Sequence, residues 1–231
     1  MKKLLSLAAA SLLLTSAVMA QDSYSETRNV TGFSTVSFAV AGEVHISLGQ
    51  DYKVVLAGDR DFVSKIETKV SGGDLVIKHE KWFNAPNSKV IVYITMPSLV
   101  GIDVSGSGKV RVEDPLKGDD FEINISGSGT VLLKDVTLTD VECDISGSGK
   151  FLAEGTGTME SLEINISGSG SYAGGTVKVG SFEASISGSG SCDCYVTGML
   201  KAAISGSGSI YYSGNPKIDA SISGSGRVRM K

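Results

Sequence analysis

The chain has 231 residues, of which 21 are Lys or Arg and 25 are Asp or Glu, giving a net charge of −4. This acidic balance argues against a nucleic-acid partner and against binding to an anionic membrane. Hydrophobic residues make up 41% of the chain, but aromatic residues make up only 6%. We therefore expect a core built mainly from Leu and from small β-branched side chains.

The first 20 residues have the three parts of a secretory signal peptide. Lys2 and Lys3 supply the charged start, an apolar run extends from Leu4 to Leu14, and small residues precede Gln21. The run is shorter than a membrane span, and no later apolar stretch reaches spanning length. We expect an exported protein without a transmembrane segment, located in the periplasm, at the outer-membrane surface or outside the cell.

The region 21–104 is rich in strand patterns, and it either caps the repeats that follow or begins them with irregular coils. Its alternation predicts strands at 34–40, 43–48, 52–57, 74–79 and 89–96, and no helix is expected. Trp82 and Phe83 lie in a probable loop between the last two strands. This aromatic pair would suit contact with a glycan or a second subunit, or cover for the open end of the core. The sequence leaves these alternatives open.

Residues 105–231 carry seven copies of Ser-Gly-Ser-Gly whose starts lie 18–21 residues apart. The copies begin at 105, 126, 146, 167, 187, 205 and 223. Around each copy, apolar residues alternate with polar ones, as they do in strands with one buried face. A flexible linker would not have this phased pattern. A fixed period of this length is typical of stacked repeats.

We therefore predict an all-β fold, a parallel β-solenoid of about seven coils preceded by the irregular β-rich region. In such a stack each motif contacts its own copy, the serines form outward columns, and the glycines let the backbone pass close to the core. Antiparallel hairpins in a sandwich or barrel are the main alternative. The last strand, 227–231, has basic outward residues, which discourage further stacking at this edge.

One column of this stack would be acidic. Glu122, Glu142, Glu163 and Glu183 take the same position in successive repeats, where stacking would hold them roughly 4.8 Å apart. A second column beside it contains Asp103, Asn124, Asp144 and Asn165. Bound Ca²⁺ or a basic partner would relieve the repulsion, whereas a solvated face that keeps the protein soluble explains the same residues. The four Glu residues, with Trp82 and Phe83, are the candidate binding residues.

The three cysteines, Cys143, Cys192 and Cys194, fall on apolar-facing positions. Cys143 lies two repeats before the other two, so stacked coils would separate them by roughly 10 Å, which exceeds the reach of a disulfide. Free core thiols are the favoured interpretation. A Cys-x-Cys metal site is disfavoured because no histidine is close in the sequence.

Three groups of residues carry a resemblance to a known family. They are Val30-Thr31-Gly32-Phe33, Met96-Pro97-Ser98-Leu99 running into the first motif, and the repeated Ile-Ser-Gly-Ser-Gly. Over nearly the whole mature chain, the layout resembles the head GIN domain family of exported bacterial proteins, which are described as autotransporter-adhesin heads. The resemblance implies a β-helical fold and an adhesive role.

Catalytic constellations are not evident in the sequence. The only histidines are His45 and His79, both expected to be solvated, and no Ser-His-Asp set, phosphate loop or zinc spacing is recognisable. We expect a non-enzymatic adhesin or envelope scaffold that binds a glycan or another surface protein, with homo-oligomerisation as an option. The alternatives are a polysaccharide-active enzyme on a β-helix, and a purely structural or ice-binding hydroxyl array. The acidic residues recur with the repeat and are not clustered as in a catalytic groove, which argues against a polysaccharide-active enzyme.

Overall fold

The computed structural model describes residues 24–80 and 89–231. The predicted signal peptide and the pair Trp82-Phe83 lie outside the described residues. Within the described part, no helix is long and apolar enough to cross a membrane.

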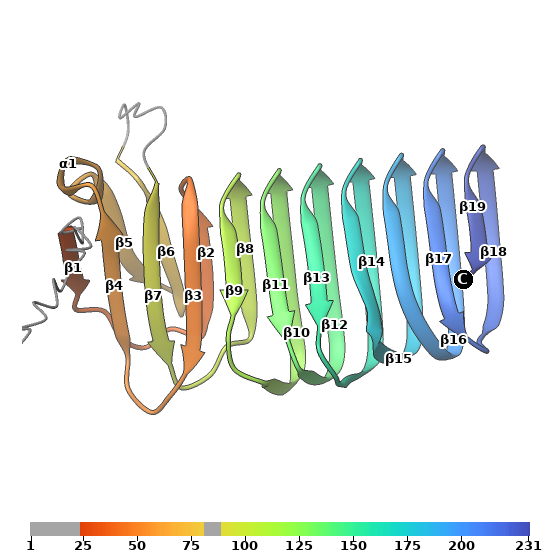
Figure 1. Cartoon of the computed structure of the whole chain (residues 1–231), viewed down its shortest axis with the longest axis horizontal. Coiled ribbons are helices and arrows are strands. Elements are labelled where there is room, and N and C mark those ends of the chain that lie inside the picture. Colours follow the sequence, from red (N-terminus) through yellow and green to blue (C-terminus); the bar gives the residue numbers. More distant parts are fainter. Residues whose placement is uncertain (1–23, 81–88) are drawn as a thin grey trace, which may run out of the picture.

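The chain winds between two facing rows of strands, so that each coil lies beside the previous one along a single axis (Figure 1). The strands are β1 Tyr24–Arg28, β2 Thr35–Ala39, β3 Gly42–Leu48, β4 Lys53–Gly58, β5 Ile66–Ser71, β6 Asp74–His79, β7 Val90–Met96, β8 Gly101–Gly106, β9 Lys109–Val112, β10 Leu116–Gly127, β11 Thr130–Lys134, β12 Val136–Gly147, β13 Lys150–Glu154, β14 Thr158–Gly168, β15 Ser171–Gly188, β16 Ser191–Gly206, β17 Ser209–Gly214, β18 Lys217–Gly224 and β19 Arg227–Met230. A short helix, α1, spans Arg60–Val63.

The order of strands in each row confirms the predicted parallel solenoid. The first row runs β5, β6, β2, β8, β10, β12, β14, then the C-terminal parts of β15 and β16, then β18. The second row runs β1, β4, β7, β3, β9, β11, β13, then the N-terminal parts of β15 and β16, then β17 and β19. From β6 and β7 to the last coil, neighbouring coils pair in parallel, and equivalent repeat positions are in register.

The N-terminal region builds coils in an order that differs from the chain order. The strands β2 and β3 lie between β6 and β7 on one side and β8 and β9 on the other, although they precede both in the sequence. The five predicted strands of this region are confirmed to within one residue at each end. The strands β1 and β5 and the helix α1 were not expected. At the N-terminal end, β1 pairs antiparallel with β4, and β5 pairs antiparallel with β6.

Each Ser-Gly-Ser-Gly motif forms the tight corner between the two rows. The first glycine has a left-handed conformation, as at Gly127 with φ +104°, where a Cβ atom would lie 2.8 Å from the carbonyl oxygen of Gly106 in the previous coil. The second glycine passes over the core: at Gly190 a Cβ would lie 2.7 Å from Cγ2 of Ile166. Backbone bonds join successive corners, because the second serine of each motif donates its N–H to the first glycine of the copy before. Glycine is therefore required twice per corner, for two different reasons.

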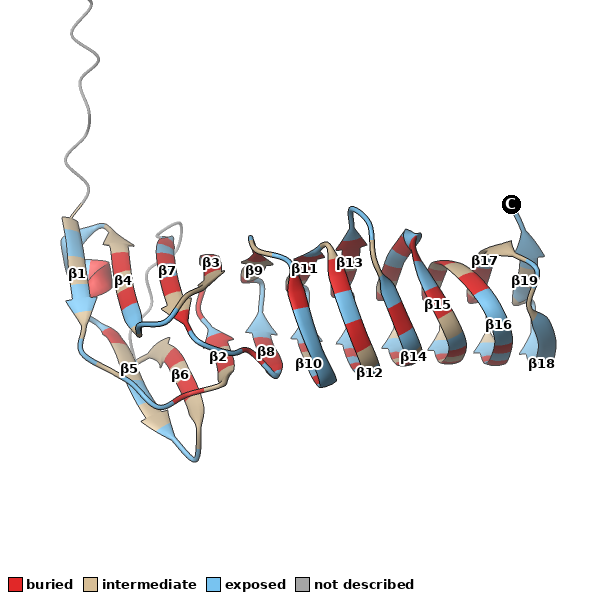
Figure 2. Cartoon of the chain, turned by 90° about the horizontal axis from the view of Figure 1, so that it is seen from below, coloured by how far each residue is buried: buried red, intermediate tan, exposed pale blue. Residues whose placement is uncertain are grey.

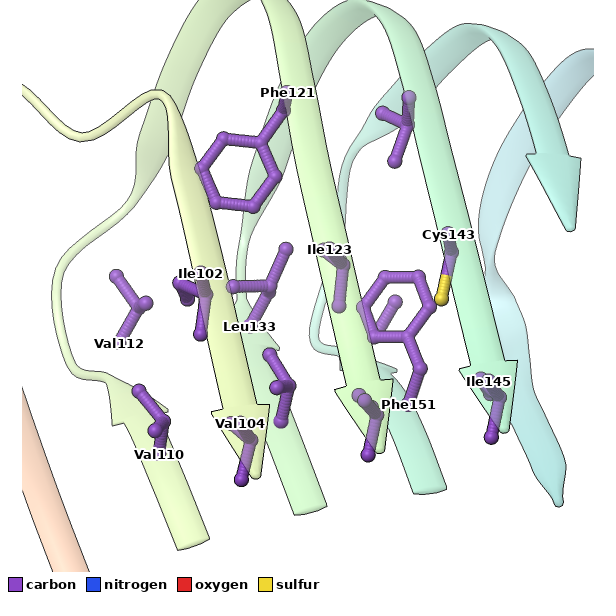
Figure 3. Close-up of a cluster of buried hydrophobic side chains, with 14 of the residues drawn as sticks. Ile102, Val104, Val110, Val112, Phe121, Ile123, Leu133, Cys143, Ile145 and Phe151 are labelled. Atoms are coloured by element: carbon purple, nitrogen blue, oxygen red, sulfur yellow. The ribbon is translucent and has the colours of Figure 1, made fainter. Parts of the chain in front are cut away.

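The inward side chains of both rows meet in one core (Figure 3). Ile123 of β10 and Phe151 of β13 belong to opposite rows and are each fully buried. The residue before the motif is at most 2% exposed in the first six copies, as the alternation predicted. Val100 shares this alternation but is 46% exposed, because β8 begins only at Gly101.

Replacing Gly190 with Ala should lower the free energy of unfolding by about 1–3 kcal/mol, since the added methyl group overpacks a rigid contact with Ile166. Gly118→Ala is the matched control: its Cβ would meet only Cδ2 of Leu138 at an ordinary 3.7 Å, and we expect a change within about 0.5 kcal/mol. Urea unfolding followed by circular dichroism measures both. Equal stability of the two variants would contradict the corner geometry.

Candidate functional site

A shallow groove follows the outer face of the first row along the solenoid axis. Its C-terminal part has a volume of about 610 Å³ and its N-terminal part about 360 Å³, and both parts include Asp144 and Ser146. We call this surface the ladder groove. One column in it consists of the first serine of each motif, Ser105, Ser126, Ser146, Ser167, Ser187, Ser205 and Ser223. The other consists of Asp103, Asn124, Asp144, Asn165, Ser185, Ala203 and Ser221.

The ladder groove is concave because the side chains in its two columns are short. Successive serines are direct register neighbours, as Ser146, Ser167 and Ser187 illustrate, so no longer side chain interrupts the column. Polarity changes along the second column, from acids and amides near β8 to Ser and Ala near β16. The groove therefore presents hydroxyl, amide and carboxylate groups beside an apolar lining that includes Ile145, Ile166, Ile186 and Ile204, and it has a distinct polar end.

The polar end of the ladder groove gathers carboxylates and an amide, with Lys78 as the one basic residue in its lining. The hydroxyl of Ser37 lies 2.8 Å from Oδ2 of Asp74 and 3.0 Å from Oδ2 of Asp103, although a hydroxyl has one proton to donate. The other oxygen of Asp74, Oδ1, is buried without a hydrogen-bond partner. Asn124 donates from Nδ2 to Oδ1 of Asp103 at 2.9 Å and to Glu122 at 2.8 Å. Asp103 and Asp144 line the groove and can accept hydrogen bonds from a ligand, and Lys78 can donate to one.

The four predicted Glu residues are brought together as a column. Glu122, Glu142, Glu163 and Glu183 are consecutive register neighbours. The first three line a second groove of about 860 Å³ at the bend of the strands, beside Asp119, Asp120 and Asp140. Glu183 lies outside that groove and forms a 2.6 Å ion pair with Lys201.

Part of the repulsion in the Glu column is relieved within the chain. Lys201 neutralises Glu183, and amide N–H groups of Asn124 and Asn165 donate to Glu122 and Glu163 at 2.8 and 3.4 Å. Among residues 24–80 and 89–231, no three His, Cys, Asp or Glu side chains are grouped so that they could hold a metal ion. The Ca²⁺ hypothesis for this column stays a prediction.

The cysteines are free and buried, as the sequence predicted. Loss of solvation raises the pKa of Cys143 well above its ordinary value. Burial, followed by the charge of Asp193, raises the pKa of Cys194 to about 12. Thiols with raised pKa values are poor nucleophiles and poor metal ligands at neutral pH. Their position among core side chains indicates a packing role.

The outer face of the second row carries a different cluster. Nδ1 of His45 lies 2.7 Å from Glu113, and the His45 ring stacks on Tyr93 with a centroid distance of 5.4 Å. Arg111 approaches the same Glu113 carboxylate at 3.8 Å. His45 therefore has a carboxylate and an aromatic ring as partners in addition to being partly solvated. This contact could not be predicted, because the parallel register of β3 and β9 brings together residues that are 68 apart in the chain.

Together these features define a class of protein: a two-rowed parallel β-solenoid with an axial groove and repetitive polar columns on its outer face. The sequence profile of the family described as "Putative auto-transporter adhesin, head GIN domain" matches residues 32–216. The chain belongs to this family, as its motifs indicated. No curated protein matches the sequence.

Solved structures of similar proteins share the fold. A protein from Bacteroides fragilis, titled a putative adhesin, has 25% sequence identity and a TM-score of 0.85 over 92% of this chain and 98% of its own. A protein from Parabacteroides distasonis, titled a putative lipid binding protein, has 23% identity and a TM-score of 0.74 over the same shares of the two chains. A putative adhesin from Parabacteroides merdae has 18% identity and a TM-score of 0.72 over 92% of this chain and 97% of its own.

Glu142→Gln should raise the free energy of unfolding by less than about 1 kcal/mol, because it removes like-charge repulsion from its register neighbours Glu122 and Glu163. The gain should vanish near 1 M salt, where the Debye length is about 3 Å. Glu154→Gln is the control, because its register neighbour is Lys134; this change should be neutral or slightly destabilising. Urea titrations at low and high salt measure both, and a salt-independent gain at Glu142 would count against a charge effect.

The folded chain should not react with an aromatic disulfide reagent at pH 8, and all three thiols should react in urea, because burial keeps them protonated and inaccessible. Raised thiol pKa values mean that the folded chain retains protons that the unfolded chain loses. Stability should therefore fall as pH rises from the ordinary thiol pKa of 9.0 toward about 12 for Cys194. Rapid reaction of the native chain would disprove the packing role.

Proposed function

We propose that the chain is a non-enzymatic adhesin of the bacterial exterior, and that it holds an extended glycan along the ladder groove. The observation that carries this proposal is the continuity of the groove, in which one column repeats the same serine from coil to coil and the other consists of short side chains. A polymer with a regular repeat can make the same contact on successive coils. Many weak contacts in series then give useful affinity without a deep pocket.

The chemistry of the groove supports a neutral or amino-bearing glycan. The carboxylates of Asp103 and Asp144 in the groove favour a ligand that supplies hydroxyl or amine donors, and Lys78 beside them can donate to a hydroxyl oxygen. The neighbouring column of Glu122, Glu142 and Glu163 disfavours sulfated glycans and uronic acids by charge repulsion. Membership of the adhesin-head family is consistent with a binding role at the cell exterior.

Filling the ladder groove should abolish glycan binding. The double variant Ser167→Tyr/Ser187→Tyr places two aromatic side chains on neighbouring coils in the serine column, where both residues are exposed and in register. The control is Ser171→Tyr/Ser191→Tyr, an in-register serine pair in the second row. Array binding of the purified chain to neutral, amino and acidic glycans should show neutral or amino ligands, lost in the first double variant and kept in the second.

Incubating the bound glycans with the chain separates binding from catalysis. Unchanged glycans in chromatography agree with an adhesin, whereas shortened products would favour the polysaccharide-active enzyme. Equal binding by both double variants would place the contact outside the ladder groove, and preference for sulfated glycans would overturn the charge argument.

A further inference from the structure

The second column of the ladder groove alternates between an acid and an amide over four coils. The residues in direct register are Asp103, Asn124, Asp144 and Asn165. The strands that carry them, β8, β10, β12 and β14, lie side by side along the axis (Figure 2). Because neighbouring strands are about 4.8 Å apart, the two acidic positions are separated by about 9.6 Å. The charge pattern of the groove therefore repeats every two coils, beside a serine column that repeats every coil.

Avoidance of charge repulsion does not explain this alternation. The adjacent Glu column, on the same face of the same strands, has carboxylates on consecutive coils with no neutral residue between them. This face therefore tolerates acids at the spacing of one coil. In the second column, the Nδ2 group of Asn124 donates to Asp103 at 2.9 Å and to Glu122 at 2.8 Å. The amide thus holds Asp103 in place, and Asp103 and Asp144 are the acids of the groove.

Both acids keep acceptor capacity for a ligand. The carboxylate of Asp144 is exposed and has no hydrogen-bond or ion-pair partner among the described residues. Asp103 accepts from Asn124 and lies near the Ser37 hydroxyl, but a carboxylate offers about four lone-pair sites. The basic residue of the lining, Lys78, lies on β6, two coils before Asp103, and its Nζ is 3.5 Å from the carboxylate of Glu67. Neither acid of the groove forms an ion pair with a described residue.

An extended 1,4-linked glycan has the same two-step repeat. One sugar ring advances the chain by nearly the spacing of one coil, about 4.8 Å. Where all the links are equatorial, each ring is turned over relative to the ring before it. The substituent at carbon 2 then faces one edge of the chain and the other edge in turn. A chain that lies along the ladder groove therefore presents this substituent to the second column once every two coils, and to the serine column on the coils between.

We propose that the N-terminal part of the ladder groove binds a 1,4-linked chain of amino sugars, with the amines of alternate rings paired with Asp103 and Asp144. This inference rests on the proposed glycan-binding function and names the class of glycan. The ammonium groups supply both the donors and the positive charge that the two carboxylates lack. The ring between them turns its amine toward the serine column, where a hydroxyl oxygen can accept a hydrogen bond. Three consecutive rings are enough to reach both acids.

The second column limits the number of such ion pairs to two. After Asn165 its positions carry no charge, and they are occupied by Ser185, Ala203 and Ser221. A third amine, two coils beyond Asp144, would lie at the coil of Ser185, where Glu183 is already paired with Lys201. Affinity should therefore rise with chain length up to three rings and change little beyond.

Titration calorimetry with 1,4-linked glucosamine oligomers of two, three and four rings tests this dependence on length. The titrations use a mildly acidic buffer, in which the amines are protonated and the Asp side chains remain ionised. The trimer should bind about threefold to fivefold more tightly than the dimer, as one additional exposed ion pair allows, and the tetramer should differ from the trimer by less than about twofold. Fully N-acetylated oligomers of the same lengths lack the charge and should show no such step.

Two substitutions on β12 locate the step. Asp144→Asn should abolish the difference between dimer and trimer and leave dimer binding in place, because Asp103 remains. Asp140→Asn is the matched control: it removes the same charge from an exposed position on the same strand, but Asp140 lines the other groove. The step between dimer and trimer should persist in this variant.

The outcomes separate this inference from the proposed function. Binding of neutral 1,4-linked glucose oligomers, without a step between the dimer and trimer of glucosamine, would overturn the inference and leave the proposed function in place. An equal step in Asp144→Asn, or in the N-acetylated series, would overturn it as well. Failure of the unmodified chain to bind any glycan would overturn the proposed function together with the inference.

Discussion

The close approach of one coil's corner to the core of the coil before it governs the rest of the structure. At Gly190 and its equivalents from Gly129 onward, the backbone lies directly over an isoleucine or valine of the previous coil, at a distance that leaves no space for a Cβ atom. This contact fixes the position of each corner relative to the core. The backbone hydrogen bond from the second serine of a motif to the first glycine of the previous motif fixes the register. A shift by one residue would put a side chain into the glycine position and turn the apolar face outward. The register of the stacked coils is thus set by steric exclusion at the Ser-Gly-Ser-Gly corner of each coil.

In-register stacking turns a linear repeat into surface columns. A residue change within one repeat then alters the surface of a single coil. The second column can therefore vary from Asp103 to Ala203 while the serine column stays constant. The ladder groove continues from coil to coil but differs in polarity at its two ends. An extended ligand would therefore bind with a preferred direction.

The periodic part of the fold could be predicted because its information is local and repeated. Apolar alternation, motif spacing and the glycine pairs all indicated parallel coils, and the columns of Glu and Ser followed from that arrangement. The order of the N-terminal coils could not be predicted, because β2 joins β8 through a register that no repeated motif marks. The contacts of Ser37 with Asp74 and Asp103 were missed for the same reason, since Ser37 and Asp74 precede the repeats. Concavity of the groove depends on how short side chains lie beside longer ones over several coils, which a residue pattern alone does not show.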